Sequence, residues 1–230
     1  IRNNVADADY LQVTATPYSL YLQPDDTENE DGFFKPRKPA FTVSLPVFPG
    51  YIGGDFYFSE NSEEDIPAKF LLKEISLDER NALKKEDRRV FRLEEVLFSD
   101  RVKTIRSGIL NFIVGACIRR IQQKDNNEPK KKYSFVVHTE QNKSSHDWQM
   151  VIVDKIKSEL LRVLNDNINF LDSLIEKSYI DNMESLRLGE DLHIPELTDV
   201  KNEVYHALRE DYLMITKVNS DKEVKELLDE

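Results

Sequence analysis

Apolar residues recur every three to four positions over much of the chain, which is the spacing of an amphipathic helix. The longest such run covers residues 102–121. Within it, residues 109–118 are apolar almost all round, so we expect this helix to be buried on more than one side. The same spacing predicts helices over residues 146–164, 168–180 and 195–208.

Shorter segments combine β-branched, aromatic and aliphatic residues in the manner of strands. They cover residues 10–14, where we expect a buried strand, 133–138 and 212–218. A fourth segment, 41–47, is predicted to be an edge strand, because Pro46 has no N–H for a central ladder. From the strand at 133 onward the order is strand, helices, strand, helix. This order predicts a parallel α/β sheet with functional loops at the carboxyl ends of its strands.

Composition narrows the class of protein. A chain of 230 residues forms one large domain or two small ones, and only 7 glycines favour helices with a modest sheet. The single cysteine, Cys117, lies in a helical pattern and fits a reducing cytoplasm. The longest apolar segment, 108–118, is too short to span a bilayer and is interrupted by Asn111. We therefore expect a cytoplasmic protein with no membrane partner.

The net charge of −11 argues against a free-standing nucleic-acid binder, which is usually basic. A local basic patch would still allow DNA contact. Compact basic runs occur at Lys35, Arg37 and Lys38, and again at residues 130–132. Such runs either touch phosphates or are solvated loops, and the second is the commoner case.

The predicted strand at 10–14 runs directly into Thr14, Ala15, Thr16 and Pro17. Pro17 biases the preceding threonine away from helix, so the strand ends here with two hydroxyls in place. Such hydroxyls commonly cap a turn. A strand that ends in Thr-Ala-Thr-Pro also resembles motif III of the superfamily 2 helicases, which couples ATP hydrolysis to nucleic-acid binding.

Three further segments strengthen this resemblance. They read FPGYIGGDFYF at 48–58, RSGILNFIVGACIRRIQ at 106–122 and YSFVVHTEQNKSSHDWQ at 133–149. Together with LQVTATPYSLYLQ at 11–23, their order resembles the Z-one domain family of putative endonucleases, which are helicase-like proteins of bacterial restriction and defence loci. The family's glycine loop then corresponds to Gly50, Tyr51, Gly53 and Gly54. Such a loop either approaches a ligand or forms a plain tight turn.

The resemblance implies a partial RecA-like, α/β fold, with a parallel sheet and large helical insertions. Residues 1–58 would be the last part of a first RecA-like domain, 59–125 a helical connection, and 126–230 the start of a second domain with an insertion at about 150–211. ATP and magnesium would bind in a longer parent protein. We expect neither to bind tightly to this chain, because it has no Gly-x-x-x-x-Gly-Lys-Ser/Thr phosphate loop.

The third segment supplies the candidate contacts to nucleic acid or to the interdomain cleft, in the position of helicase motif IV. Two histidines fall short of the three or four ligands of a metal site, so we expect no metal there. A lysine and two serines at a helix start suit phosphate binding, and serine N-capping is an equally good explanation. The candidate residues are His138, Thr139, Lys143, Ser144, Ser145 and His146.

These observations predict a fragment of a helicase-like, DNA-acting ATPase of a restriction or phage-defence system. One alternative is a DNA endonuclease whose catalytic residues are not recognisable; Asp199-Val-Lys201 and Glu223-Val-Lys225 lie in helical patterns rather than on adjacent strands. The other is a non-catalytic scaffold that holds other subunits of a defence complex, which the acidic surface and the extra helices would suit.

Overall fold

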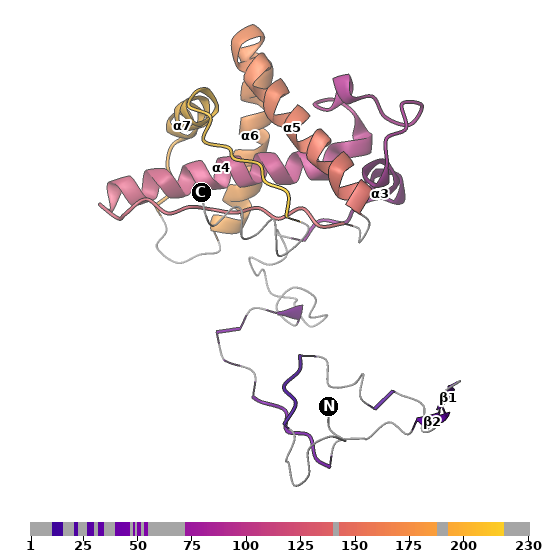
Figure 1. The fold of residues 1–230 in the computed structure, drawn as a ribbon. Coiled ribbons are helices and arrows are strands. Elements are labelled where there is room, and N and C mark those ends of the chain that lie inside the picture. Colours follow the sequence, from indigo (N-terminus) through magenta and orange to yellow (C-terminus); the bar gives the residue numbers. More distant parts are fainter. Residues whose placement is uncertain are drawn as a thin grey trace. The chain divides into compact units, whose positions relative to one another are not determined.

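The chain forms two compact units, Ile1–Ile52 and Gly53–Glu230, and each is considered by itself (Figure 1). In the first unit, β1 (Thr27–Asn29) and β2 (Gly32–Phe34) pair as a short antiparallel hairpin. The computed structural model describes residues 11–15, 21–22, 27–29, 32–34, 40–46, 48, 50–51, 53–54, 72–139, 143–187 and 193–218.

The second unit is helical and is built around one long helix, α4 (Figure 1). Helices α6 and α7 pack against α4, while α3 packs against α5 and against the short helix η4. Two short 3-10 helices, η3 and η4, precede α4 and join it to α3. The helices are α3 (Leu77–Lys84), η3 (Leu93–Glu95), η4 (Asp100–Val102), α4 (Lys103–Asp125), α5 (Lys143–Asp166), α6 (Ile168–Leu186) and α7 (Leu197–Arg209).

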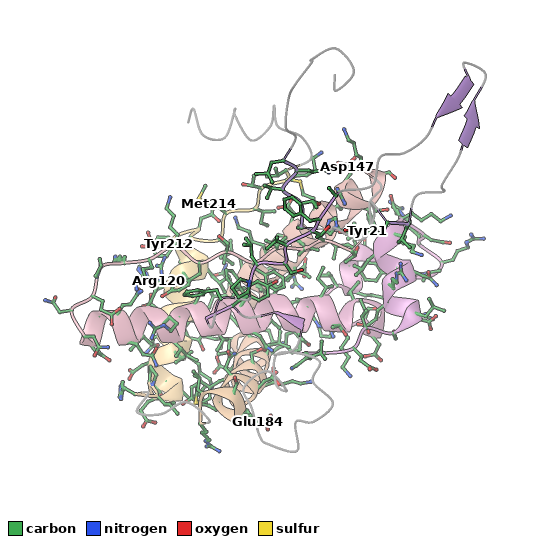
Figure 2. The ribbon with its side chains drawn as sticks, turned by 90° about the horizontal axis from the view of Figure 1, so that it is seen from below. Tyr21, Arg120, Asp147, Glu184, Tyr212 and Met214 are labelled. Carbon is green, nitrogen blue, oxygen red and sulfur yellow. The ribbon has the colours of Figure 1, made fainter. Side chains whose placement is uncertain are left out.

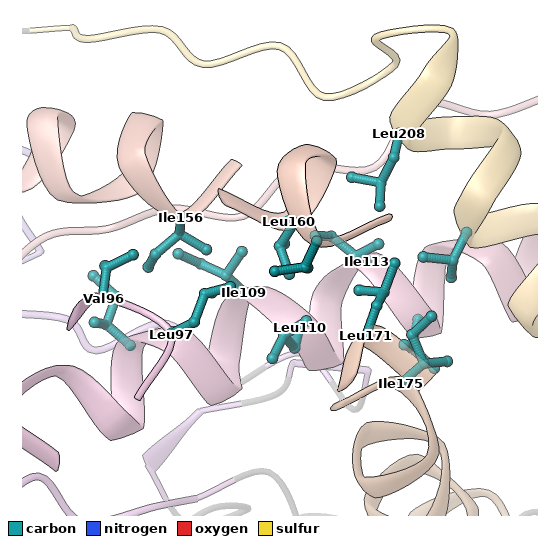
Figure 3. Close-up of a cluster of buried hydrophobic side chains, with 14 of the residues drawn as sticks. Val96, Leu97, Ile109, Leu110, Ile113, Ile156, Leu160, Leu171, Ile175 and Leu208 are labelled. Carbon is teal, nitrogen blue, oxygen red and sulfur yellow. The ribbon is translucent and has the colours of Figure 1, made fainter. Parts of the chain in front are cut away.

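A single hydrophobic core joins α4 to the other long helices (Figure 3). Ile109 and Ile113 lie on one side of α4, and Val114 and Ile118 lie further round the helix; all four are buried. The prediction that this helix is buried on more than one side is therefore confirmed. Its partners in the core are Ile156 and Leu160 of α5, Leu171 and Ile175 of α6, and Val200, Val204 and Leu208 of α7.

The helices begin where polar side chains can satisfy the first N–H groups. Ser76 and Glu79 form a reciprocal capping box at α3, and the side chain of Asn167 accepts from the Phe170 N–H at α6. Asn127, just beyond α4, has a φ of 54°, a left-handed conformation that asparagine tolerates and that ends the helix.

All four predicted helices are present, with shifted ends. α4 extends to Asp125 and α6 to Leu186. α5 begins at Lys143, earlier than expected, so Ser144 and Ser145 lie inside its first turn; the prediction that one of them caps it is wrong. α7 begins after the predicted Pro195, with Glu196 as its N-cap.

The predicted RecA-like α/β fold is wrong for the described residues. Their only strands are the antiparallel β1 and β2, and no parallel sheet is present among them. Residues 133–138 and 212–218 contain no strand, and neither do 11–14 or 41–46. The side chains of Leu11 and Val13, expected in a buried strand, are 82% and 88% exposed.

The extended segments of the helical unit lie against helices instead of pairing in a ladder. Phe135 stacks on Phe112 of α4 with ring centroids 5.6 Å apart, and it lies directly over Gly108. A Cβ at Gly108 would come within 3.3 Å of the Phe135 ring, so the missing side chain allows this close approach. The sequence of this segment thus specified an extended backbone, and the surface against which Phe135 packs is a helix.

The segment 212–218 is attached in a similar way. Figure 2 shows Arg120 beside Tyr212, where the guanidinium lies 5.0 Å from the centre of the ring. At the other end, the Lys217 ammonium donates to the carboxylate of Asp147, near the start of α5, at 2.6 Å. The segment therefore runs along the helices to the start of α5.

Candidate nucleic-acid interface

The start of α5 is fixed to the end of α3 by two side chains. The indole N–H of Trp148 donates to the carbonyl of Ala82 at 2.8 Å. The amide of Gln149 donates to the carbonyl of Leu83 at 3.2 Å and also to the hydroxyl of Thr139. These bonds satisfy carbonyls in the last turn of α3 and hold three segments together.

The structure brings the motif IV-like residues together at this junction. The rings of His138 and His146 lie 5.7 Å apart, centre to centre. Lys143 and Ser144 are exposed in the first turn of α5, the end of a helix at which the macrodipole favours anions. Ser145 is buried and does not face solvent.

A basic segment that sequence reasoning missed lies beside this junction. Residues 80–92, which cover the second half of α3 and the turn after it, carry six basic and two acidic side chains, a net charge of +4. The signal was present in the sequence, but the basic residues are spread over thirteen positions and do not form one compact run. They are Arg80, Lys84, Lys85, Arg88, Arg89 and Arg92.

The guanidinium groups of this basic segment are exposed and partly oriented by carboxylates. Arg88 pairs with Glu86 at 3.2 Å, and Arg89 makes a two-pronged pair with Asp87 at 3.2 and 3.1 Å. The hydrogen bond from the Arg89 side chain is the main reason that the pKa of Asp87 is lowered. Arg92 is exposed, and among the described residues its side chain makes no hydrogen bond or ion pair.

A cavity of about 160 Å³ opens within the basic segment and reaches Trp148. Its lining combines aromatic and aliphatic side chains with two guanidinium groups and two carboxylates. The lining residues are Glu86, Arg88, Phe91, Arg92, Leu93, Glu94 and Trp148. The surface formed by residues 80–92, this cavity and the start of α5 is the candidate nucleic-acid interface.

The motif III-like residues are only partly described. Thr14 has no regular secondary structure and Ala15 lies in a bend, and both are exposed. Thr16 and Pro17 lie outside the described residues. The coupling role of this motif stays a prediction, although the buried strand expected before it is wrong.

The glycine-loop residues divide between the two units. Gly50 lies in a turn that is closed by a hydrogen bond from the Tyr51 N–H to the Phe48 carbonyl at 2.8 Å. A Cβ at Gly50 would come within 2.9 Å of the Phe48 ring, an exposed side chain that could shift to admit it. Gly53 and Gly54 belong to the second unit. The geometry at Gly50 is that of a plain tight turn.

Of the two compact basic runs, residues 130–132 are exposed and 35–38 lie outside the described residues. Within the described ranges, no three or more His, Cys, Asp or Glu side chains are grouped so that they could hold a metal ion. None of the helices in those ranges is both long enough and apolar enough to cross a membrane.

Comparison with known proteins gives no relative: no family model matches the chain, and no curated protein or solved structure is significantly similar to it. The resemblance to the Z-one domain family therefore rests on the sequence motifs alone.

Proposed function

We propose that the helical unit binds nucleic acid through the basic segment and the start of α5, as part of a DNA-acting protein. The observation that carries this proposal is the net charge of +4 over residues 80–92 in a chain whose total is −11. The six positive charges lie on the segment that α5 contacts near its start, where Lys143 adds a further positive charge. ATP and magnesium are no part of this proposal.

Phosphate binding would use the exposed guanidinium groups. Arginine presents a planar set of donors that matches a phosphate, and each phosphate that is neutralised releases counterions into solution. Arg88 and Arg89 are held by neighbouring carboxylates, so a phosphate must compete for their donors, whereas Arg92 is free to bind. The acidic remainder of the chain would repel DNA elsewhere and confine binding to this surface.

Fluorescence anisotropy with a labelled oligonucleotide tests the proposal. The variant Arg88→Ala/Arg89→Ala/Arg92→Ala should bind the oligonucleotide at least about tenfold more weakly at low salt. The slope of log K against log salt concentration should also become shallower, by about 0.7 to 0.9 for each phosphate that the variant no longer neutralises. The matched control is Lys130→Ala/Lys131→Ala/Lys132→Ala, which removes the same charge from a solvated run. It should change affinity much less.

Equal losses of affinity in the two triple variants would mean that overall charge, rather than this surface, governs binding. The absence of any salt-dependent binding by the unsubstituted chain would contradict the proposal outright.

A second candidate function is that of a scaffold that binds another protein chain. The observation in its favour is the exposure of large apolar side chains on the extended segments: Val136 is 80% exposed and Met214 88% exposed. Val136→Asp/Met214→Asp should then abolish a complex that light scattering detects for the unsubstituted chain. A monomer that captures no defined partner would count against this function.

A further inference from the structure

We propose that the cavity beside Trp148 accepts a single unpaired nucleobase, so that the chain prefers single-stranded to duplex nucleic acid. This inference rests on the proposed function and adds the kind of nucleic acid that the interface recognises. A base inside a duplex is stacked and paired, so it cannot enter a side pocket without being extruded at a cost of a few kcal/mol.

The size of the cavity suits one ring system. Its volume of about 160 Å³ is well below the roughly 300–1,000 Å³ of pockets that enclose a drug-sized molecule. It is several times the roughly 30 Å³ that one water molecule occupies in the liquid. A base would fit while its sugar and phosphate stayed outside, against the guanidinium groups of the rim.

The chemistry of the lining also matches a base. Phe91, Leu93 and Trp148 line the cavity, and Phe91 and Trp148 are only 4% and 8% exposed, so a base would contact the accessible parts of their rings. The guanidinium of Arg92 can stack on a base or hold the adjoining phosphate. The carboxylate of Glu94 can accept a hydrogen bond from an exocyclic amine, which cytosine, adenine and guanine carry and thymine lacks.

Hydrogen bonds and ring packing hold the aromatic residues that line the cavity in place. Trp148 is fixed by its bond to the Ala82 carbonyl, and Phe91 packs edge-on against it at 6.4 Å between ring centres. Leu93 begins η3, and the residue after η3 is held to α4 by a bond from Arg106 to the Val96 carbonyl at 3.0 Å. Little ordering would therefore accompany binding.

Two of the charges at the rim are available. Arg92 and Glu94 are both exposed, and within the described part of the chain neither side chain makes a hydrogen bond or an ion pair. Glu86, in contrast, already pairs with Arg88. The carboxylate of Glu94 would repel a polyanion and weaken its binding unless it accepts a hydrogen bond from the ligand. The exocyclic amine of a base can donate that hydrogen bond.

Trp148 provides the measurement, because it is the only tryptophan in the chain. Its fluorescence is followed while the full chain is titrated with three probes of equal length: a single-stranded oligo(dC), the corresponding duplex, and an abasic strand that has phosphates but no bases. Anisotropy of a labelled copy of each probe is recorded in parallel. We expect oligo(dC) alone to change the Trp148 emission, and to bind more tightly than the duplex.

Glu94→Gln tests the recognition of the amine. The unsubstituted chain should bind oligo(dC) about two- to tenfold more tightly than oligo(dT), the effect of one net hydrogen bond, and Glu94→Gln should reduce this ratio. Glu95→Gln is the matched control, because it removes the same charge from the adjacent residue, which does not line the cavity. It should leave the ratio unchanged.

The two proposals fail in different ways. If the abasic strand and oligo(dC) bind equally well and neither changes the Trp148 emission, the base site is refuted and the phosphate interface stands. If the anisotropy of no probe rises, nucleic-acid binding itself is refuted. If Glu94→Gln and Glu95→Gln have the same effect on the dC-to-dT ratio, the role of Glu94 in reading the amine is refuted.

Discussion

At the scale of single residues, Glu79 shows how one buried carboxylate can join two helices. It belongs to the capping box of α3, and it also accepts from the backbone N–H of Thr104 at 2.6 Å and from the Thr104 hydroxyl at 3.0 Å. Thr104 lies in the first turn of α4, so the carboxylate also satisfies a free N–H of that helix. Burial alone would raise the pKa of Glu79, but the hydrogen bonds from Thr104 and Ser76 outweigh it and lower the pKa.

Glu79→Gln should therefore destabilise the protein by about 1 to 3 kcal/mol at pH 7, as measured by urea unfolding. Because the folded-state pKa is lowered, the carboxylate contributes stability above its unfolded pKa of about 4.3, and this contribution is lost as pH falls through the folded-state pKa. The stabilities of the two proteins should converge in acid. Glu176→Gln, an exposed position on α6, serves as control and should change stability little at any pH.

Cys117 gives a probe of the core. Burial raises the pKa of its thiol to about 12, and only the thiolate is nucleophilic. A disulfide reagent at pH 8 should react with the folded protein at least about a hundredfold more slowly than with the urea-unfolded protein, because reaction requires opening of the core. Rapid modification of the folded protein would show that α4 is not packed as described.

Sequence reasoning found the neighbourhood of the motif IV-like residues but not their individual roles. It expected Ser144 or Ser145 to cap α5, whereas the helix begins at Lys143 and Ser145 is buried. Which serine caps a helix depends on where the first turn closes, and at this junction Trp148 and Gln149 fix the helix to α3, far away in the sequence. No local pattern contains that information.

At the scale of elements, helices were predictable and sheet pairing was not. The hydrogen bonds of a helix join residues four apart in the sequence, so the spacing of apolar residues in α4 is enough to predict that helix. The pattern of side chains in 133–138 and 212–218 indicates only an extended backbone, because the partner of a strand comes from elsewhere in the chain. In this protein Phe135 stacks on Phe112 of helix α4, and its segment pairs with no strand among the described residues.

A pair of substitutions measures this difference between the elements. Leu171 on α6 is fully buried in the core, so Leu171→Ala should cost about 2 to 5 kcal/mol of unfolding free energy. Val136 in the extended segment is 80% exposed, so Val136→Ala should cost less than about 0.5 kcal/mol. Urea denaturation followed by circular dichroism measures both values. A large loss of stability at Val136 would show that another surface covers this segment in solution.

At the scale of the whole molecule, the distribution of charge matters more than its sum. The candidate interface carries positive charge, while the chain as a whole has a net charge of −11. Figure 2 shows Asp147, at the start of α5, and Glu184, near the end of α6, on opposite sides of the view. If DNA binds as proposed, charges on the α6 side would act on it only through long-range fields, which salt screens over about 8 Å at physiological ionic strength and about 30 Å at 0.01 M.

Because the two sides are separated, charge changes of equal size should affect binding differently on each side. Arg92→Glu at the rim of the cavity and Glu184→Lys on α6 each change the net charge by two units, in opposite directions. At 0.15 M salt, Arg92→Glu should weaken binding of oligo(dC) at least about tenfold, whereas Glu184→Lys should change it less than about twofold. At 0.01 M salt the effect of Glu184→Lys should grow, because its field then reaches the interface. If the two variants shifted the dissociation constant by similar factors at 0.15 M, binding would depend on net charge, and the local interface would lose its support.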